Sequence, residues 1–128
     1  MQTRQEIFET VAKHLFSQGH RAKNKDGLCS YRSDGLKCAV GVLIPDNEYR
    51  EEFDNDPADD NSVKYLCQRF DYFQNKFGHD ISFFERLQGV HDDKHNWDSN
   101  IRMRDALKEV AIKYQLDHNF LKTLSFKR

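Results

Sequence analysis

The stretch SFFERLQGVHDDKHNWDSNIRMRDALKEVAIKY, residues 82–114, decides the fold class because its apolar side chains recur at three- and four-residue intervals. Ser82 and Glu85 have the spacing of a capping box and predict the start of a helix that carries His91 near its C-terminal end. The residues expected to be buried in this helix are Phe83, Phe84, Leu87 and Val90. A polar stretch, residues 92–100, separates it from the next periodic segment.

Two further segments have the same helical period. From Ile101 onward, one apolar stripe consists of Met103, Leu107, Val110, Ala111 and Tyr114 and predicts the last long helix. At the other end of the chain, Thr3 and Glu6 form a capping-box pattern, and Gly19 marks the end of a helix. Its apolar stripe consists of Ile7, Phe8, Val11, Ala12, Leu15 and Phe16.

The middle of the chain adds mixed signals. Asp26-Gly27 lies between two short segments and predicts a small β-hairpin within residues 20–32, followed by a turn at residues 33–35. Residues 36–44 are apolar enough for a buried helix or a buried strand, with the helix favoured. Helices are also expected over residues 46–53 and 61–77. The predicted fold is therefore mainly helical α+β, a single compact domain with about five helices and one short hairpin.

Two regions are left without regular structure by these patterns. An acidic loop is expected near residues 50–60. Two alternatives stay open for residues 117–128: a mobile tail, or a short turn built on Phe120, Leu121 and Leu124.

The composition is that of one folded domain without a bias toward nucleic acid. Ten Phe and five Tyr supply bulky core side chains, and 20 Lys and Arg nearly balance 21 Asp and Glu among 128 residues. Phosphate contacts need a basic excess, so direct nucleic-acid binding is not expected. The chain has no run of 18 apolar residues, and the odd count of three cysteines argues against a secreted disulfide framework. A cytoplasmic protein without a cofactor is predicted.

The charge is unevenly distributed. Residues 38–62 contain eight acidic residues and one Arg, whereas the segments on both sides carry a basic excess. Such a segment either remains a solvated loop or attracts a partner with a basic surface. The candidate binding residues are Glu48, Glu51, Glu52, Asp54, Asp56, Asp59 and Asp60.

The densest group of chemically active side chains lies in CSYRSDGLKCAVGVLIPDNEY, residues 29–49. Together with Leu87, Gln88, His91 and Asp92 and the later Trp97, this stretch resembles small uncharacterised proteins of tailed phages, prophages and bacteria. The resemblance covers roughly residues 1–115 and implies an accessory protein of a phage or mobile element, in the host cytoplasm. The residues that carry the pattern are Cys29, Tyr31, Arg32, Asp34, Lys37, Cys38, Asp46, Tyr49 and His91.

Two chemical hypotheses use these residues. In the first, Cys38 is a thiolate nucleophile, His91 its base and Asp92 the residue that orients the base, as in a small hydrolase or transferase. In the second, Cys29, Cys38, His91 and His95 bind zinc, although eight residues between the cysteines is a wide spacing for a structural site. Each hypothesis has a structural alternative: Cys38 is a small buried residue, and His91-Asp92 is a polar helix end.

We therefore expect a protein that acts by protein–protein binding and inhibits a host enzyme or defence system. Its expected partner is a host protein with a basic surface, and no oligomeric state is predicted. The Cys/His enzyme and the zinc-stabilised module remain the alternatives.

Overall fold

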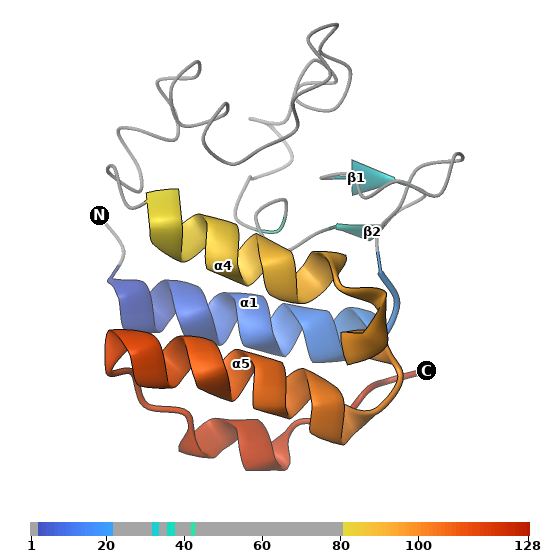
Figure 1. Cartoon of the computed structure of the whole chain (residues 1–128). Coiled ribbons are helices and arrows are strands. Elements are labelled where there is room, and N and C mark those ends of the chain that lie inside the picture. Colours follow the sequence, from blue (N-terminus) through green and yellow to red (C-terminus); the bar gives the residue numbers. More distant parts are fainter. Residues whose placement is uncertain (1–2, 22–31, 34–35, 38–41, 43–80) are drawn as a thin grey trace, which may run out of the picture.

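The computed structural model describes residues 3–21, 32–33, 36–37, 42 and 81–128. Three helices lie side by side in it: α1 (Arg4–Gln18), α4 (Ile81–Asp92) and α5 (Asn100–Tyr114) (Figure 1). The colours of Figure 1 show that α1 and α4 run in the same direction and that α5 runs in the opposite one. Two short 3-10 helices complete the helical part, η3 (Lys94–Trp97) between α4 and α5, and η4 (Asn119–Thr123) after α5.

The predicted signals at both ends of α1 are confirmed. The Thr3 hydroxyl accepts from the Glu6 amide at 3.1 Å, and the Glu6 carboxylate accepts from the Thr3 amide at 3.1 Å. Gly19 ends the helix at φ 74°, in the left-handed region that favours glycine. A Cβ there would lie 3.1 Å from the Lys127 carbonyl oxygen, so the C-terminal residues pass close to this point.

The other two helices agree with their apolar periods but not with every predicted boundary. Helix α4 begins at Ile81, so Ser82 lies inside its first turn and is not its N-cap, contrary to the predicted capping box. Helix α5 begins at Asn100, where Ser99 is the N-cap and its hydroxyl accepts from the Arg102 amide at 3.2 Å. The pattern of buried residues, which depends on period rather than on the first residue, is as predicted in both helices.

The α+β fold class was a wrong prediction, because the described part of the chain is a helical domain. Its one strand pairing joins β1 (Arg32–Ser33) to β2 (Leu36–Lys37), antiparallel and two residues long on each side. A pairing of this length buries no face of its own, and it does not flank Asp26-Gly27, where the hairpin was expected. The described residues contain three α-helices instead of five. Residues 26–27, 46–53 and 61–77 lie outside them.

The three helices form the described core without a sheet, because their apolar stripes cover one another. The fully buried large side chains come from all three: Phe8, Leu15 and Phe16 of α1, Phe83, Phe84 and Leu87 of α4, and Met103 of α5. Val42 packs against this core from outside the bundle.

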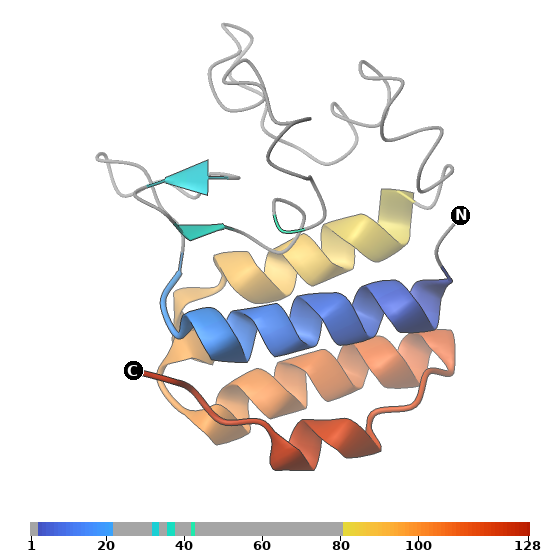
Figure 2. The same cartoon turned by 180° about the vertical axis from the view of Figure 1, so that it is seen from behind.

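The C-terminal residues pack on the bundle through aromatic rings. Phe120 meets Phe8 edge to face, with ring centroids 5.8 Å apart, and Phe126 lies between Phe16 and Trp97 at 5.0 and 5.7 Å. The Lys127 amide donates to the Phe16 carbonyl at 3.1 Å. Figure 2 shows this segment running back along the bundle toward the end of α1. The short turn predicted around Leu121 is confirmed as η4, with Leu121 buried.

None of the helices within the described ranges has the length and apolar character that crossing a membrane requires.

The burial pattern predicts the stability of two variants of α5. We expect Leu107→Ala, at a fully buried site, to lower the free energy of unfolding by about 2–5 kcal/mol through the lost apolar contacts and the remaining cavity. The matched variant Ile112→Ala, on the exposed side of the same helix, is expected to change it by about 0.5 kcal/mol or less. Urea denaturation in dilute solution, followed by circular dichroism, measures both. Equal losses would contradict the assignment of the core face.

Candidate functional site

The predicted site residues fall on both sides of the boundary of the described structure. His91, Asp92 and His95 lie in the helical part, and Arg32 pairs with Lys37 across β1 and β2. The remaining predicted residues lie outside the described ranges: Cys29, Tyr31, Asp34, Cys38, Asp46, Tyr49, and the acidic residues Glu48, Glu51, Glu52, Asp54, Asp56, Asp59 and Asp60. The site that the structure describes is therefore the one around His91.

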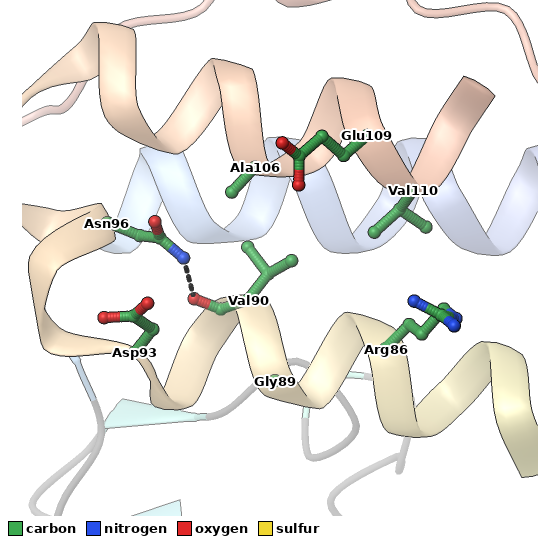
Figure 3. Close-up of a pocket in the computed structure, with 8 residues that line it drawn as sticks. All are labelled: Arg86, Gly89, Val90, Asp93, Asn96, Ala106, Glu109 and Val110. Atoms are coloured by element: carbon green, nitrogen blue, oxygen red, sulfur yellow. Dashed lines mark hydrogen bonds between the residues drawn. The ribbon is translucent and has the colours of Figure 1, made fainter. Parts of the chain in front are cut away.

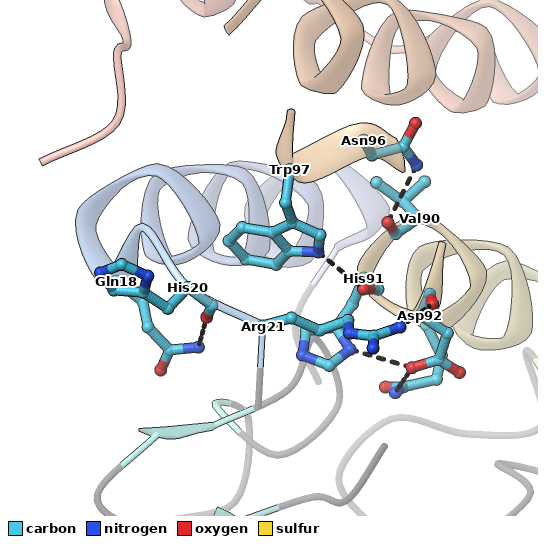
Figure 4. A network of polar contacts seen from close by, with 9 residues as sticks. Gln18, His20, Arg21, Val90, His91, Asp92, Asn96 and Trp97 are labelled. Carbon is cyan, nitrogen blue, oxygen red and sulfur yellow. Dashed lines mark hydrogen bonds and ion pairs between the residues drawn. The ribbon is translucent and has the colours of Figure 1, made fainter. Parts of the chain in front are cut away.

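His91 is completely buried at the C-terminal end of α4 (Figure 4). Its Nδ1 lies 2.9 Å from Oδ1 of Asp92, and the same oxygen accepts from the Gln88 amide at 2.8 Å. A carboxylate can only accept, so this geometry assigns the Nδ1 proton to His91. The Trp97 ring meets the imidazole edge to face, with centroids 5.7 Å apart. The imidazole is thus oriented from two directions.

The last four carbonyl groups of α4 all accept hydrogen bonds. The Gly89 carbonyl accepts from the Asp93 amide at 3.1 Å, which continues the helical pattern. The other three accept from side chains: Val90 from Asn96 Nδ2 at 3.0 Å, His91 from Trp97 Nε1 at 2.8 Å, and Asp92 from an Arg21 guanidinium nitrogen at 2.8 Å. Helix ends leave these groups without partners inside the helix. Here the donors come from η3, which contributes Asn96 and Trp97, and from Arg21 after the end of α1 (Figure 4).

The acidic Asp92 is unfavourably placed with respect to the helix dipole. A carboxylate in the last turn meets the negative end of the helix, an effect of about 0.3–1 kcal/mol at exposed sites. Three donors offset this: Gln88 and the His91 imidazole at the carboxylate, and the Arg21 cation at the neighbouring carbonyl. The Asp92 side chain is 41% exposed, so one side of the pair faces solvent.

An imidazole whose Nδ1 is held by a carboxylate is also found in catalytic triads, where the other ring nitrogen is the general base. The structure therefore brings together two of the three residues of the Cys/His hypothesis. The third, Cys38, lies outside the described residues.

The two predicted histidine ligands lie in different elements. His91 is in α4, whereas His95 is in η3, where its side chain is 64% exposed and its Nδ1 is 3.6 Å from Asp98 Oδ2. Within the described part of the chain, no three His, Cys, Asp or Glu side chains gather closely enough to hold a metal ion. The cysteines of the zinc hypothesis, Cys29 and Cys38, lie outside that part.

A shallow groove of about 380 Å³ runs between α4 and α5 (Figure 3). Its apolar floor consists of Gly89, Val90, Ala106 and Val110, and its polar rim of Arg86, Asp93, Asn96 and Glu109. Asn96 already donates to the Val90 carbonyl, and the other rim side chains project along the two helices rather than toward a common point (Figure 3). The groove lacks convergent polar groups, which a specific small-molecule site needs.

Sequence reasoning missed Arg21 and Asn96 and gave Trp97 no role. The one local signal was the placement of a single Trp, which carries an N–H donor, in a polar stretch directly after a helix. Arg21 reaches a carbonyl 71 residues away along the chain, and a single sequence carries no local signal of such a contact.

Comparison with protein-family models, curated protein sequences and solved structures finds no match for this chain.

The helix-end hydrogen bonds predict the effect of Trp97→Phe. Phenylalanine keeps an aromatic ring but leaves the buried His91 carbonyl without its donor, so we expect the free energy of unfolding to fall by about 1–3 kcal/mol. Chemical denaturation followed by circular dichroism measures this change. Tryptophan fluorescence is not suitable, because the variant lacks the only tryptophan of the chain.

Tyr114→Phe is the matched control, because it also removes one polar group from an aromatic ring of the same bundle. A change of about 0.5 kcal/mol or less is expected for it. An unchanged stability of Trp97→Phe would show that the indole N–H contributes nothing at this helix end.

Proposed function

We propose that this protein acts by binding a protein with a basic surface through its acidic segment, residues 46–60, as an accessory protein of a phage or mobile element. Inhibition of a host enzyme or defence system is the activity that this binding would produce. The observation that carries the proposal is the concentration of acidic residues in one segment of a chain that is otherwise slightly basic. Such a focused field attracts an oppositely charged partner and orients it during encounter.

The polar groups at the end of α4 support this proposal, because their hydrogen bonds serve the fold of the helical part. Gln88, His91, Asp92 and Trp97 form hydrogen bonds that end α4 and hold η3 against it. The groove between α4 and α5 has no convergent polar groups. A scaffold of this kind suits a binding protein whose specificity resides outside its helical core.

The test is capture of partners on the tagged full-length protein, with a variant in which four acidic residues are replaced by Lys. These are Glu51, Glu52, Asp59 and Asp60. A single stoichiometric partner is expected for the unmodified chain. The purified partner should bind the variant at least about tenfold more weakly, and salt should weaken the binding of the unmodified chain.

A second variant controls for the change of net charge. It replaces four acidic residues of the helical part by Lys: Glu9, Glu85, Asp98 and Glu109. Retained capture by this control together with loss by the first variant supports the acidic segment as the binding surface. Equal capture by all three proteins would refute it.

The Cys/His enzyme is the second candidate function, and the 2.9 Å contact between His91 and Asp92 favours it. A thiolate paired with His91 would make Cys38 react with iodoacetamide at pH 6, where ordinary thiols are protonated.

For this candidate we expect Asp92→Asn to slow the alkylation of Cys38 at pH 6 by at least about tenfold, because the imidazole loses the carboxylate that orients it. His95→Gln, at an exposed histidine on η3, should leave the rate unchanged. Mass spectrometry after timed alkylation identifies Cys38 among the three cysteines. Slow alkylation of Cys38 in the folded unmodified protein would exclude the enzyme hypothesis.

A further inference from the structure

Within the described residues, the large apolar side chains that remain exposed are two isoleucines of α5. Ile101 is 66% exposed and Ile112 is 60% exposed. They are eleven positions apart, which is close to three helical turns, so they lie about 20° apart around the helix and about 16 Å apart along its axis. Isolated exposed apolar residues are common on protein surfaces, but two on one line of one helix define a stripe.

The charged residues between the isoleucines complete a symmetric pattern. Asp105 and Lys108 are both exposed and lie on the same line of the helix. The midpoint of the two isoleucines falls between positions 106 and 107, and Asp105 and Lys108 are equally distant from that midpoint. The order along the stripe is therefore apolar, acidic, basic, apolar. We call these four residues, Ile101, Asp105, Lys108 and Ile112, the α5 stripe.

A stripe with this order is complementary to itself when two copies run antiparallel. A two-fold axis at the midpoint places Ile101 of each copy against Ile112 of the other, and Asp105 of each against Lys108 of the other. A parallel arrangement would oppose like charges. Isologous contacts of this kind, with the same patch on both subunits, are typical of two-fold dimers.

Two other sides of α5 are covered by the rest of the described structure. Met103, Leu107, Val110 and Ala111 face the core. Arg104 donates through its Nε to the Leu124 carbonyl at 3.1 Å and through a second guanidinium nitrogen to the same oxygen, which fixes the side toward the C-terminal segment. The α5 stripe is the exposed apolar line that remains on this helix.

We propose that the α5 stripe is a homodimer interface, at which the same stripe of a second copy of this chain packs antiparallel. The interface has two isoleucine pairs and two ion pairs along about three helical turns. So few contacts bury less surface than the roughly 1,200–2,000 Å² of a standard stable interface. The dimer therefore exchanges with monomer, and its population rises with protein concentration.

Charge reversal within the stripe tests both the partner and the register. In Lys108→Asp, positions 105 and 108 are both acidic, and in Asp105→Lys both are basic. Like charges therefore oppose each other in the homodimer of either variant. We expect each variant to self-associate at least about tenfold more weakly than the unmodified chain in sedimentation equilibrium. The full-length protein is used, under reducing conditions, with circular dichroism to verify that each variant is folded.

Mixing the two variants provides the decisive measurement. The acidic stripe of Lys108→Asp matches the basic stripe of Asp105→Lys, so the mixture should form heterodimers although neither variant pairs with itself. Lys113→Asp, the same charge change on α5 outside the stripe, should dimerise like the unmodified chain. A chain that is monomeric up to millimolar concentration, or a dimer that neither reversal weakens, overturns the proposal.

Discussion

The end of α4 is the constraint on which the described structure depends. Three of its last carbonyl groups need donors from outside the helix, and a buried carbonyl without a donor costs on the order of 1–3 kcal/mol. The donors come from two different places, η3 and the residues that follow α1. Satisfying them fixes where the chain turns after α4 and where it passes after α1. Hydrogen bonds as well as apolar packing therefore connect α4 with η3 and with the residues that follow α1.

Trp97 extends this constraint to the C-terminal residues. Its indole N–H ends α4 at the His91 carbonyl, and its ring stacks on Phe126 at an interplanar angle of 18°. Phe126 in turn contacts Phe16, and its amide donates to the Asn100 side chain at 2.8 Å. One side chain thus connects the polar helix end with the aromatic packing of the last residues.

The sequence was sufficient for the capping box of α1 and for the buried helix faces, but not for the start of α4, where the predicted capping box at Ser82 was wrong. Thr3 and Glu6 stand three residues apart and form their predicted box, and the apolar periods identified the buried faces of α1, α4 and α5. The α+β prediction with one short β-hairpin was wrong, because helical stripes that cover one another form the described core without strands. Within the candidate site, the sequence indicated His91 and Asp92 as a pair but not the roles of Arg21, Asn96 and Trp97. Those roles depend on distances that only the packed helices set.

The burial of His91 bears directly on which function the chain performs. A general base must exchange its proton with substrate or solvent, and an imidazole with no exposed surface does so only through a neighbour or an opening motion. The same burial serves a structural role without any such motion, because the ring packs on Trp97 and its Nδ1 is satisfied by Asp92. The structural role of His91 needs no motion, whereas the catalytic role does, so we place the binding proposal before the enzyme. The proposed dimer would carry two acidic segments, so a partner with two basic sites would meet the second segment at a raised effective concentration.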